Sequence, residues 1–384
     1  MTLPASSFVF RCPTRLVAGE GAVEKLGGIA MELRCRRALV VSDPGVVTAG
    51  HTSLGSESLR RSGLDVECFS GFSENPTTQH VESGAAVARA FRPDIIVGIG
   101  GGSSMDCAKG INFLHSLGGT MRDYHGRDRA KGPMLPSIAV PTTAGTGSET
   151  QSFALISDAE TGMKMACGAA AAAFRVAILD PRLTLTQPAG VTALTGIDAI
   201  SHAVESHVSL AATPASRVFS REAWRLLCRN FPRVLTDGAD LEARAAVQLA
   251  AAWAGIAIEN SMLGAAHSLA NPLTAGHGVV HGQAVGVVLP HVVRFNGRHA
   301  WERYAELWAD LSGENEDADA ADRLADWLTA TLRSSGLETS LRGLGIERPD
   351  SQQLAEAAAT QWTAGFNPRP VVVDELRQLY EAAS

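Results

Sequence analysis

Residues 94–109, DIIVGIGGGSSMDCAK, combine a strand, a glycine-rich turn and the start of a helix in one run. The segment Asp94–Ile99 is rich in isoleucine and valine, which is typical of a buried strand. Gly100–Ser104 follows at once, and a helical pattern then extends through Leu114. A strand that passes directly into a helix is one half of a parallel βαβ unit. The run therefore predicts an α/β fold.

The rest of the first half repeats this alternation of strands and helices. Further strands are predicted at Ala38–Ser42, Val66–Phe69, Ser137–Val140 and Val176–Leu179, and helices at His51–Ser62 and Thr78–Phe91. Such an alternation predicts a doubly wound parallel sheet, which binds ligands beyond the carboxyl ends of its strands.

From Pro188 onward, Ala, Leu, Arg and Glu dominate. Apolar residues recur at helical spacing, as in Ala243–Ile258 and Asp319–Ser335, whereas Val285–Leu289 fits either a strand or a buried helix. We expect an α/β domain at residues 1–187 and an all-helical domain at residues 188–384. The active site is expected in the cleft between them.

Composition excludes several classes of protein. The 384-residue chain is 45% hydrophobic with a formal net charge of −7, so it lacks the basic surface of a nucleic-acid-binding protein. Its six cysteines include no C-x-x-C pair, which predicts reduced thiols in a cytoplasmic protein. The N-terminal MTLPASSFVFRCP lacks the features of a signal peptide. No stretch approaches the roughly 18 consecutive apolar residues of a membrane span, so we expect no membrane partner.

Two loops are candidates for binding a nucleotide. Gly100–Ser103 follows a strand, where glycines let the backbone approach a ligand and a helix N-terminus offers free N–H groups to a phosphate. We expect Ser103 or Ser104 to cap that helix. Pro141–Glu149, PTTAGTGSE, offers hydroxyl donors to a pyrophosphate and ribose. Either loop alone is as consistent with an ordinary turn, and the first is not the G-x-G-x-x-G fingerprint. Together they favour one shared nucleotide.

Asp43 ends the first predicted strand and is placed to accept hydrogen bonds from a ribose diol. A carboxylate there would repel a 2′-phosphate, which favours NAD over NADP. Asp43 precedes the glycine loop instead of following it by about 20 residues, which indicates a non-standard topology. A helix N-cap is an equally good interpretation of this residue.

Four residues of the second half could bind a metal. Asp198 and His202 are four apart, so they share one face of a helix. His267 precedes Asn271-Pro272, where we expect its helix to end. His281 lies fourteen residues after His267. One carboxylate and three imidazoles suit a divalent ion such as Fe(II) or Zn(II), with a position open for a substrate oxygen. Ordinary polar residues of helices are the alternative.

With these residues identified, the chain resembles the iron-containing (group III) alcohol dehydrogenase family. The resemblance runs from Gly19-Glu-Gly21 to Asn367-Pro-Arg-Pro370, nearly the whole chain. Its most specific motifs are GGGSSMDCAK (Gly100–Lys109), PTTAGTGSE (Pro141–Glu149), TGIDAISHAVE (Thr195–Glu205) and the His267/His281 pair. The resemblance implies a Rossmann-like domain followed by a helical domain, a dehydroquinate synthase-like architecture, with NAD(P) between them.

The functional residues of the family map onto this sequence. The implied metal ligands are Asp198, His202, His267 and His281. The implied cofactor contacts are Asp43, Asn75, Gly101, Gly102, Ser103, Thr142, Thr143, Thr146 and Lys164. The resemblance implies NAD(P) as cofactor, and the Asp43 carboxylate makes NADP less favoured than NAD. The resemblance implies Fe(II) as metal, with Zn(II) as the alternative. It also implies a homodimer, for which Phe8–Val17 is the expected edge strand at an interface.

The chain departs from the family at Asn271. Many relatives have a histidine at this position, four residues after the third metal ligand, which helps to move the alcohol proton. Asparagine cannot titrate. Either the proton leaves through water and the cofactor ribose, or His277 has taken the role. Without the resemblance, His277 is a solvent-facing loop residue or a further imidazole ligand.

These observations predict a metal-dependent oxidoreductase that transfers hydride reversibly between a small alcohol and NAD(P), giving an aldehyde or ketone. One alternative is an NAD-using lyase or cyclase of the dehydroquinate synthase-like superfamily, which needs a basic phosphate pocket that is not obvious in the second half. The other is a non-catalytic nucleotide-binding relative. The intact ligand set disfavours that class and the metal-free maleylacetate reductases.

Overall fold

A computed structural model describes residues 7–314, 319–347 and 349–384. Residues 1–6, part of the stretch analysed above for a signal peptide, lie outside the described residues. The chain divides into two compact units. One is Cys12–Gln187, and the other is Pro188–Ser384 together with the N-terminal segment that ends at Arg11.

The Cys12–Gln187 unit is built on a parallel sheet. Within the described residues, the order of its strands is β1-β9-β6-β4-β2-β3. These strands are β1 (Arg15–Ala18), β2 (Arg37–Val41), β3 (Asp65–Phe69), β4 (Ile95–Gly100), β6 (Ser137–Pro141) and β9 (Val176–Leu179). Val97 of β4 is paired with Val40 of β2 and Ile138 of β6, so β-branched side chains fill the centre of the sheet.

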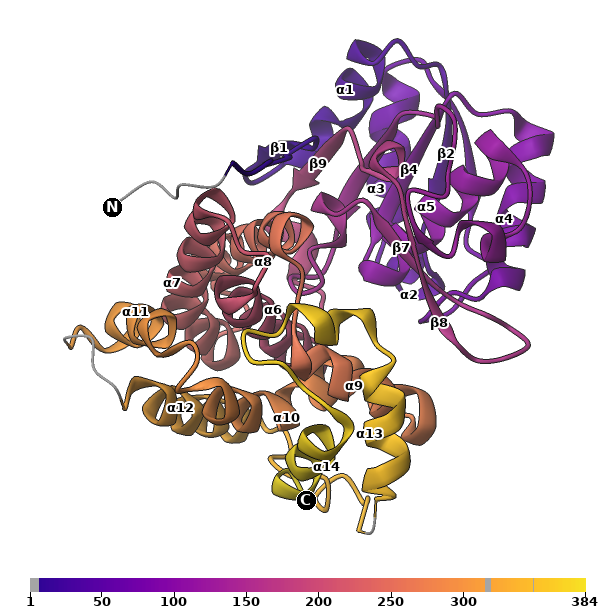
Figure 1. Cartoon of the computed structure of the whole chain (residues 1–384). Coiled ribbons are helices and arrows are strands. Elements are labelled where there is room, and N and C mark those ends of the chain that lie inside the picture. The colour runs from indigo at the N-terminus through magenta and orange to yellow at the C-terminus, as the bar shows by residue number, and fades with distance from the viewer. Residues whose placement is uncertain (1–6, 315–318, 348) are drawn as a thin grey trace. The chain divides into compact units, whose positions relative to one another are not determined.

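Helices cover both faces of this sheet, as a parallel sheet requires. The helices are α1 (Leu26–Glu32), α2 (Pro44–Thr48), α3 (His51–Arg61), α4 (Thr78–Phe91) and α5 (Gly102–Leu117). On one face, Ile95, Val97 and Ile99 join residues of α1 and α3 in the hydrophobic core. On the other face Gly98 lies against α5, since a Cβ atom there would be 3.2 Å from the sulfur of Met105. This α/β arrangement (Figure 1) confirms the predicted fold class.

A second small sheet was not predicted from the sequence. Its strands, in the order β5-β8-β7, are β5 (Gly126–Arg127), β7 (Phe153–Ser157) and β8 (Lys164–Gly168). β7 and β8 are antiparallel, and Gly162 in their connection has a φ of 72°. The strands are short and include Lys164 and several small residues, so they lack a clear strand-like hydrophobic pattern.

The other unit contains helices and no strands in its described residues. The helices are α6 (Ala189–Val208), α7 (Pro214–Thr236), α8 (Leu241–Ser261), α9 (Ala265–His277), α10 (His281–Asn296), α11 (Trp301–Ser312), α12 (Ala320–Ser334), α13 (Ser351–Ala359) and α14 (Val373–Ala382), with the short 3₁₀ helix η6 (Trp362–Phe366). The N-terminal segment packs on this unit, where the ring of Phe10 stacks on Phe219 with 5.4 Å between centroids.

The structure corrects two predicted boundaries and resolves one ambiguity. Val285–Leu289 is helical, within α10. The prediction that a helix ends at Asn271-Pro272 is wrong, because α9 continues through Pro272 to His277. A proline inside a helix costs about 3 kcal/mol, and we attribute its tolerance to the burial of this part of α9. The predicted strand at Phe8–Val17 is shorter than expected, since β1 begins at Arg15 and lies at the sheet edge.

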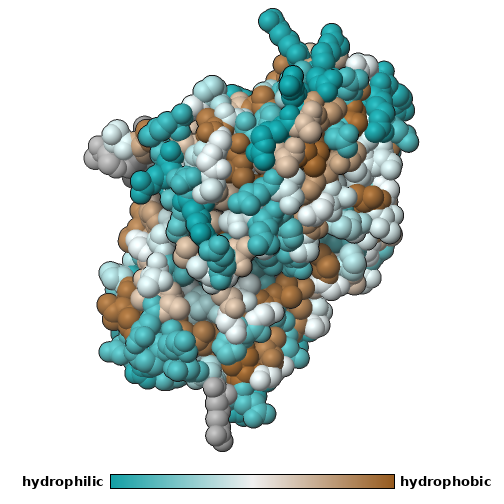
Figure 2. Space-filling view, turned by 90° about the vertical axis from the view of Figure 1, so that its right-hand side faces the viewer, coloured by the Kyte–Doolittle hydropathy of each residue, from teal (hydrophilic) through white to brown (hydrophobic). Residues whose placement is uncertain are grey.

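Among the described helices, α8 is long and apolar enough to span a membrane. Within its most apolar window, 67% of the residues are buried inside the structure, as in the core helix of a folded domain. On the face of the molecule drawn in Figure 2, hydrophilic residues are mixed with scattered hydrophobic ones. The hydropathy of α8 is therefore accounted for by its packing.

Candidate functional site

Three helices bring the predicted metal ligands of the helical unit together. Asp198 and His202 lie one turn apart on α6, His267 lies in the first turn of α9, and His281 is the first residue of α10. The Asp198 oxygen Oδ1 is 3.4 Å from Nε2 of His202 and 3.7 Å from Nε2 of both His267 and His281. One carboxylate oxygen thus faces three imidazole nitrogens.

The geometry and burial of this cluster fit a divalent cation. Donor atoms of Asp198, His267 and His281 all lie within 4.8 Å of one another. Asp198 and His267 are each only 4% exposed. Within the described part of the chain, Asp198 Oδ1 and His267 Nε2 are buried without a hydrogen-bond partner. Leaving such atoms unsatisfied costs about 1–3 kcal/mol each, a cost that a bound cation would remove.

The ionisation of the cluster reflects opposing effects of burial and charge. Burial disfavours the charged form of Asp198. The imidazoles of His202, His267 and His281 nevertheless hold the pKa of this carboxyl well below its usual range. Burial also disfavours the charged form of His267, but the carboxylates of Glu205 and Asp198 raise its pKa to about 9. Because metal ligands must be deprotonated, a cation would displace a proton from this site.

Glu205 contacts this cluster from outside and is not among the residues predicted from the sequence. Its carboxylate contacts Nδ1 of His267, and the residue is buried. The signal was present in the sequence, because positions 198, 202 and 205 recur at helical spacing and therefore share one face of α6.

Asn271, at the position where relatives have a histidine, and His277, the candidate for proton transfer, have different surroundings. Asn271 lies on α9 one turn after His267, and its Nδ2 donates to Oε1 of Gln361 at 2.9 Å. His277 is the last residue of α9 and is exposed, four residues before His281. Asn271 is thus held in a neutral amide pair, whereas the titratable His277 is in contact with solvent.

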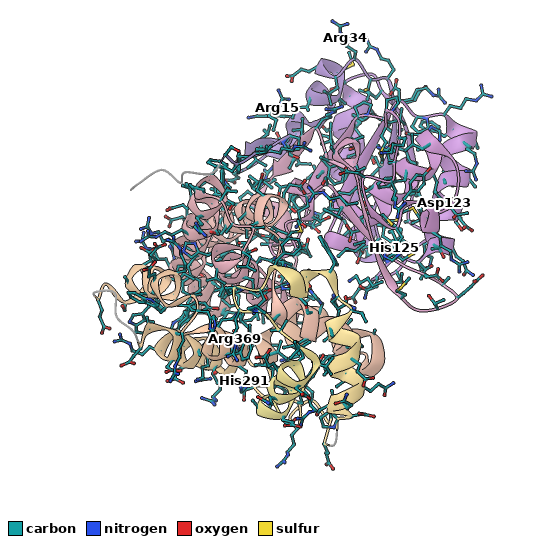
Figure 3. The ribbon with its side chains drawn as sticks, in the orientation of Figure 1. Arg15, Arg34, Asp123, His125, His291 and Arg369 are labelled. Atoms are coloured by element: carbon teal, nitrogen blue, oxygen red, sulfur yellow. The ribbon has the colours of Figure 1, made fainter. Side chains whose placement is uncertain are left out.

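The family motif Asn367-Pro-Arg-Pro370 is tied to α10. Asn367 and Asn296 exchange two hydrogen bonds through their side-chain amides, at 2.8 and 2.9 Å. The Arg369 guanidinium lies over the ring of Phe295, 3.7 Å from its centroid. Figure 3 labels Arg369, which follows η6, and His291, which lies on α10. The motif therefore anchors the chain after η6 to the helix that begins at His281.

In the α/β unit, the predicted nucleotide loops lie at the switch point of the sheet. β2 and β4 are neighbours, and the chain leaves them toward opposite edges, which is where doubly wound sheets bind ligands. Asp43 directly follows β2, and Gly100–Gly102 ends β4 and starts α5. The hydroxyl of Ser104 donates to Oδ2 of Asp43 at 3.0 Å and thereby links the two segments.

Asp43 is a helix N-cap, the second of its two interpretations. Its Oδ1 accepts from the backbone N–H groups of Gly45 and Val46, at 3.0 and 3.1 Å, at the start of α2. The prediction that Ser103 or Ser104 caps α5 is wrong. The N-cap is Gly101, which has no side chain, because the Ser104 hydroxyl is used by Asp43 and Ser103 Oγ accepts from the backbone N–H of Asn75.

Three of the residues implied as cofactor contacts form a chain of hydrogen bonds. The backbone N–H of Asn75 donates to Ser103 Oγ at 3.2 Å, and Nζ of Lys164 donates to Oδ1 of Asn75 at 3.3 Å. Asn75 has a φ of 55°, a left-handed conformation that asparagine tolerates better than most residues. Lys164 of the unpredicted small sheet is thereby joined to the start of α5.

The Pro141–Glu149 loop packs against the Gly100–Ser103 loop. The backbone N–H of Thr142 donates to the carbonyl of Gly100 at 2.9 Å. A Cβ atom at Gly101 would lie 3.3 Å from the side chain of Thr143, and one at Gly102 would lie 2.8 Å from that of Thr146. The glycines therefore allow the side chains of Thr143 and Thr146 to pack directly against the N-terminus of α5.

A buried lysine, Lys109, connects the helix after the first loop to the second loop. Nζ of Lys109 on α5 donates to the carbonyl of Ser148 at 2.7 Å, to its hydroxyl at 2.9 Å and to the carbonyl of Phe153 at 2.7 Å. The Ser148 hydroxyl in turn donates to Oδ1 of Asp106 at 2.9 Å. Burial raises the pKa of the neighbouring Glu149 to about 7, although Lys109 acts in the opposite direction. Lys109 thus joins the GGGSSMDCAK helix to the PTTAGTGSE loop.

The chain is similar to known proteins over most of its length. Residues 13–181 match the iron-containing alcohol dehydrogenase family, and residues 192–384 match the C-terminal domain of that family. The chain is 35% identical to the NAD-dependent methanol dehydrogenase of Bacillus methanolicus, over 97% of this chain and 99% of that protein. It is 34% identical to the 1,3-propanediol dehydrogenase of Klebsiella pneumoniae, over 98% of both.

The solved structures include a 1,3-propanediol oxidoreductase that is 33% identical. It aligns with a TM-score of 0.95, over 99% of this chain and 100% of that one. The matching segments, the relatives and the fold lead to one conclusion: the chain belongs to the iron-containing alcohol dehydrogenase family and is an oxidoreductase.

Proposed function

We propose that the protein reversibly oxidises a small alcohol to an aldehyde or ketone, with NAD as the hydride acceptor and a divalent metal at Asp198, His202, His267 and His281. The observation that carries this proposal is the convergence of three imidazoles on one buried carboxylate oxygen. The names of two relatives, a methanol and a 1,3-propanediol dehydrogenase, support a short and hydrophilic substrate.

The metal that we propose is Fe(II), with Zn(II) as the alternative. A carboxylate with imidazoles is a ligand set that several first-row divalent ions accept, and the name of the family favours iron. When bound, such an ion polarises the substrate oxygen and lowers the pKa of the alcohol. Asp198 and the three histidines would hold it in a buried site where charge is poorly screened by water.

The loops at the switch point are proposed to orient NAD. Gly101, Gly102 and Ser103 would present the N-terminus of α5 to the pyrophosphate, with Thr142, Thr143, Thr146, Asn75 and Lys164 around it. Asp43 would meet the ribose diol with the carboxylate that also caps α2, which favours NAD over NADP. NAD accepts a hydride, so these residues serve to position it.

Replacement of Gly102 by valine tests the cofactor site. The Cβ atom of the new side chain would lie 2.8 Å from Cγ2 of Thr146, so the two loops would have to move apart. We expect the dissociation constant for NAD to rise at least about tenfold, which corresponds to one lost hydrogen bond to a charged group. Titration calorimetry measures this constant. The control is Gly28→Val on α1, where a Cβ atom meets nothing within 4 Å, and equal NAD affinity in the two variants would refute the assignment.

The proton of the alcohol is proposed to leave through His277. Asn271 cannot titrate, and its amide is held by Gln361, so it is assigned a role in the shape and polarity of the site. The imidazole of His277 is exposed and can exchange a proton with water. The remaining route, through water and the cofactor ribose, needs no histidine.

Substitution of His277 by glutamine distinguishes these routes. We expect kcat at neutral pH to fall about tenfold, below the roughly 100-fold typical of a general base, because water reaches this position. The difference in kcat between the variant and the unaltered protein should become smaller at high pH, where hydroxide can accept the proton in place of the imidazole. The pH profile of kcat is the measurement, with His299→Gln as the control at another exposed histidine. A profile that coincides with that of the unaltered protein would assign the proton to the other route.

The proposed activity is tested by incubating the protein with NAD, Fe(II) or Zn(II), and a series of short alcohols and diols. Net formation of NADH is expected. An NAD-using lyase or cyclase would yield no net NADH, and a non-catalytic nucleotide-binding protein would yield no product.

We also propose that the protein is a cytoplasmic homodimer, with β1 near the interface.

A further inference from the structure

A carboxylate lies on the far side of the metal-binding imidazole of His267. Glu205 is on α6, seven residues after Asp198, and it is only 3% exposed. Its Oε2 contacts Nδ1 of His267, while Nε2 of the same ring faces Oδ1 of Asp198 at 3.7 Å. The ring is thus placed between a carboxylate of the metal cluster and a carboxylate outside it.

Glu205 also fixes the backbone that carries this histidine. Its Oε1 accepts from the backbone N–H of Ala266 at 2.7 Å, one of the free N–H groups at the start of α9. The N-cap of α9 is Gly264, which has no side chain to satisfy them. A Cβ atom at Gly264 would lie 3.0 Å from Oε1 of Glu205, so glycine allows the carboxylate this close approach.

The neighbouring N–H group has a separate partner. The backbone N–H of Ala265 donates to Oδ1 of Asn367 at 3.3 Å, and Asn367 is itself held by Asn296. Glu205 is therefore not required simply to begin the helix. Its two oxygens instead join the backbone of residue 266 to the ring of residue 267.

We propose that Glu205 is a positioning residue that holds His267 with its proton on Nδ1, so that the Nε2 lone pair points to the metal. A carboxylate is an obligate acceptor, and the nitrogen that faces it must carry the proton. The other nitrogen is then free to bind a cation. This inference rests on the proposed function, because it assumes that Asp198, His202, His267 and His281 bind a metal.

Glu205→Gln separates this role from simple packing. The amide has the size of the carboxylate, and its oxygen can keep the hydrogen bond from Ala266. Its NH₂ group then faces Nδ1 of His267 and donates to it, which moves the ring proton to Nε2, the nitrogen needed by the metal. Glu205→Asp keeps a charged acceptor and is expected to recover part of the metal affinity.

A second glutamate–histidine pair in the same unit, with a buried histidine and a partly exposed glutamate, supplies the control. Oε2 of Glu306 on α11 is 3.0 Å from Nε2 of His207, and the other nitrogen of His207 contacts the hydroxyl of Ser220 at 3.1 Å. His207 is fully buried, and neither residue belongs to the metal cluster. Glu306→Gln therefore removes a carboxylate that contacts a buried histidine, without changing His267.

The experiment measures the dissociation constant of Zn(II) for the full-length protein by competition with a chromophoric chelator. The visible spectrum of the Co(II)-loaded form and the thermal unfolding of the metal-free form are recorded alongside. We expect Glu205→Gln to weaken Zn(II) binding about 10- to 100-fold and to alter the Co(II) spectrum, with little change in unfolding temperature. Glu306→Gln should bind Zn(II) as the unaltered protein does.

Two results would overturn the inference. One is equal Zn(II) affinity in Glu205→Gln and the unaltered protein. The other is an equal loss in Glu306→Gln, which would trace the effect to the removal of any carboxylate that contacts a buried histidine. Failure of the proposed function is distinguishable, because the unaltered protein itself would then bind no Zn(II), and both proposals would fall.

Discussion

Replacement of His281 by alanine is expected to lower kcat/KM for alcohol oxidation at least about 1000-fold. His281 supplies one of the three imidazoles that face Asp198, so its loss opens the ligand set and releases the metal. Lewis-acid polarisation of the substrate is worth several kcal/mol, and each 1.4 kcal/mol or so is a factor of ten in rate. Elemental analysis of the purified variant, together with steady-state kinetics, checks both expectations.

His281 is a sharper target than the other ligands because it is only partly buried. Its side chain is 30% exposed, whereas those of His202 and His267 are 6% exposed, so alanine at 281 should leave the fold intact. His291 lies ten residues further along α10 and provides the control. His291→Ala should keep both metal and turnover. A His281→Ala protein that keeps bound metal and full turnover would show that the ligand assignment is wrong.

Replacement of Lys109 by methionine is expected to lower the free energy of unfolding by about 3–5 kcal/mol. Methionine keeps the length of the side chain but removes three hydrogen bonds and one of the two lysine charges that act on the buried Asp106. Losing one partner of a buried charged network typically costs this much. Urea unfolding, followed by circular dichroism, measures the change.

The same variant should also bind NAD more weakly, because Lys109 holds the loop at Ser148 against α5. Lys25→Met, at an exposed lysine of the same unit, is the control and should change neither quantity. If Lys109→Met unfolds at the same urea concentration as Lys25→Met, the network does not stabilise the α/β unit.

The strands of the main sheet could be predicted from the sequence because their signal is local. The buried run at residues 176–179 was predicted with the bounds that β9 has, and the helix at residues 78–91 with those of α4. Each has a hydrophobic pattern that suits only one period. The glycine loops were located for the same reason, since a turn between a strand and a helix is defined by residues adjacent in sequence.

What the sequence did not predict depends on tertiary contacts. The helix signal at Pro272 is that of an end, but the buried α9 continues past it. The hydroxyl of Ser104 could cap its own helix, yet it bonds instead to Asp43, 61 residues away. Glu205 and Lys109 act through partners 62 and 39 residues away, and no local pattern specifies such pairs.

We propose that alcohol oxidation by this chain depends on a metal bound by Asp198, His202, His267 and His281. The most direct test adds Fe(II) stepwise, without oxygen, to metal-free protein in the presence of NAD and 1,3-propanediol, and records the initial rate of NADH formation. We expect the initial rate of NADH formation to rise in proportion to the added metal and to level off near one equivalent per chain. The His281→Ala variant should show no such rise. Equal NADH formation by metal-free and metal-loaded protein would contradict this proposal.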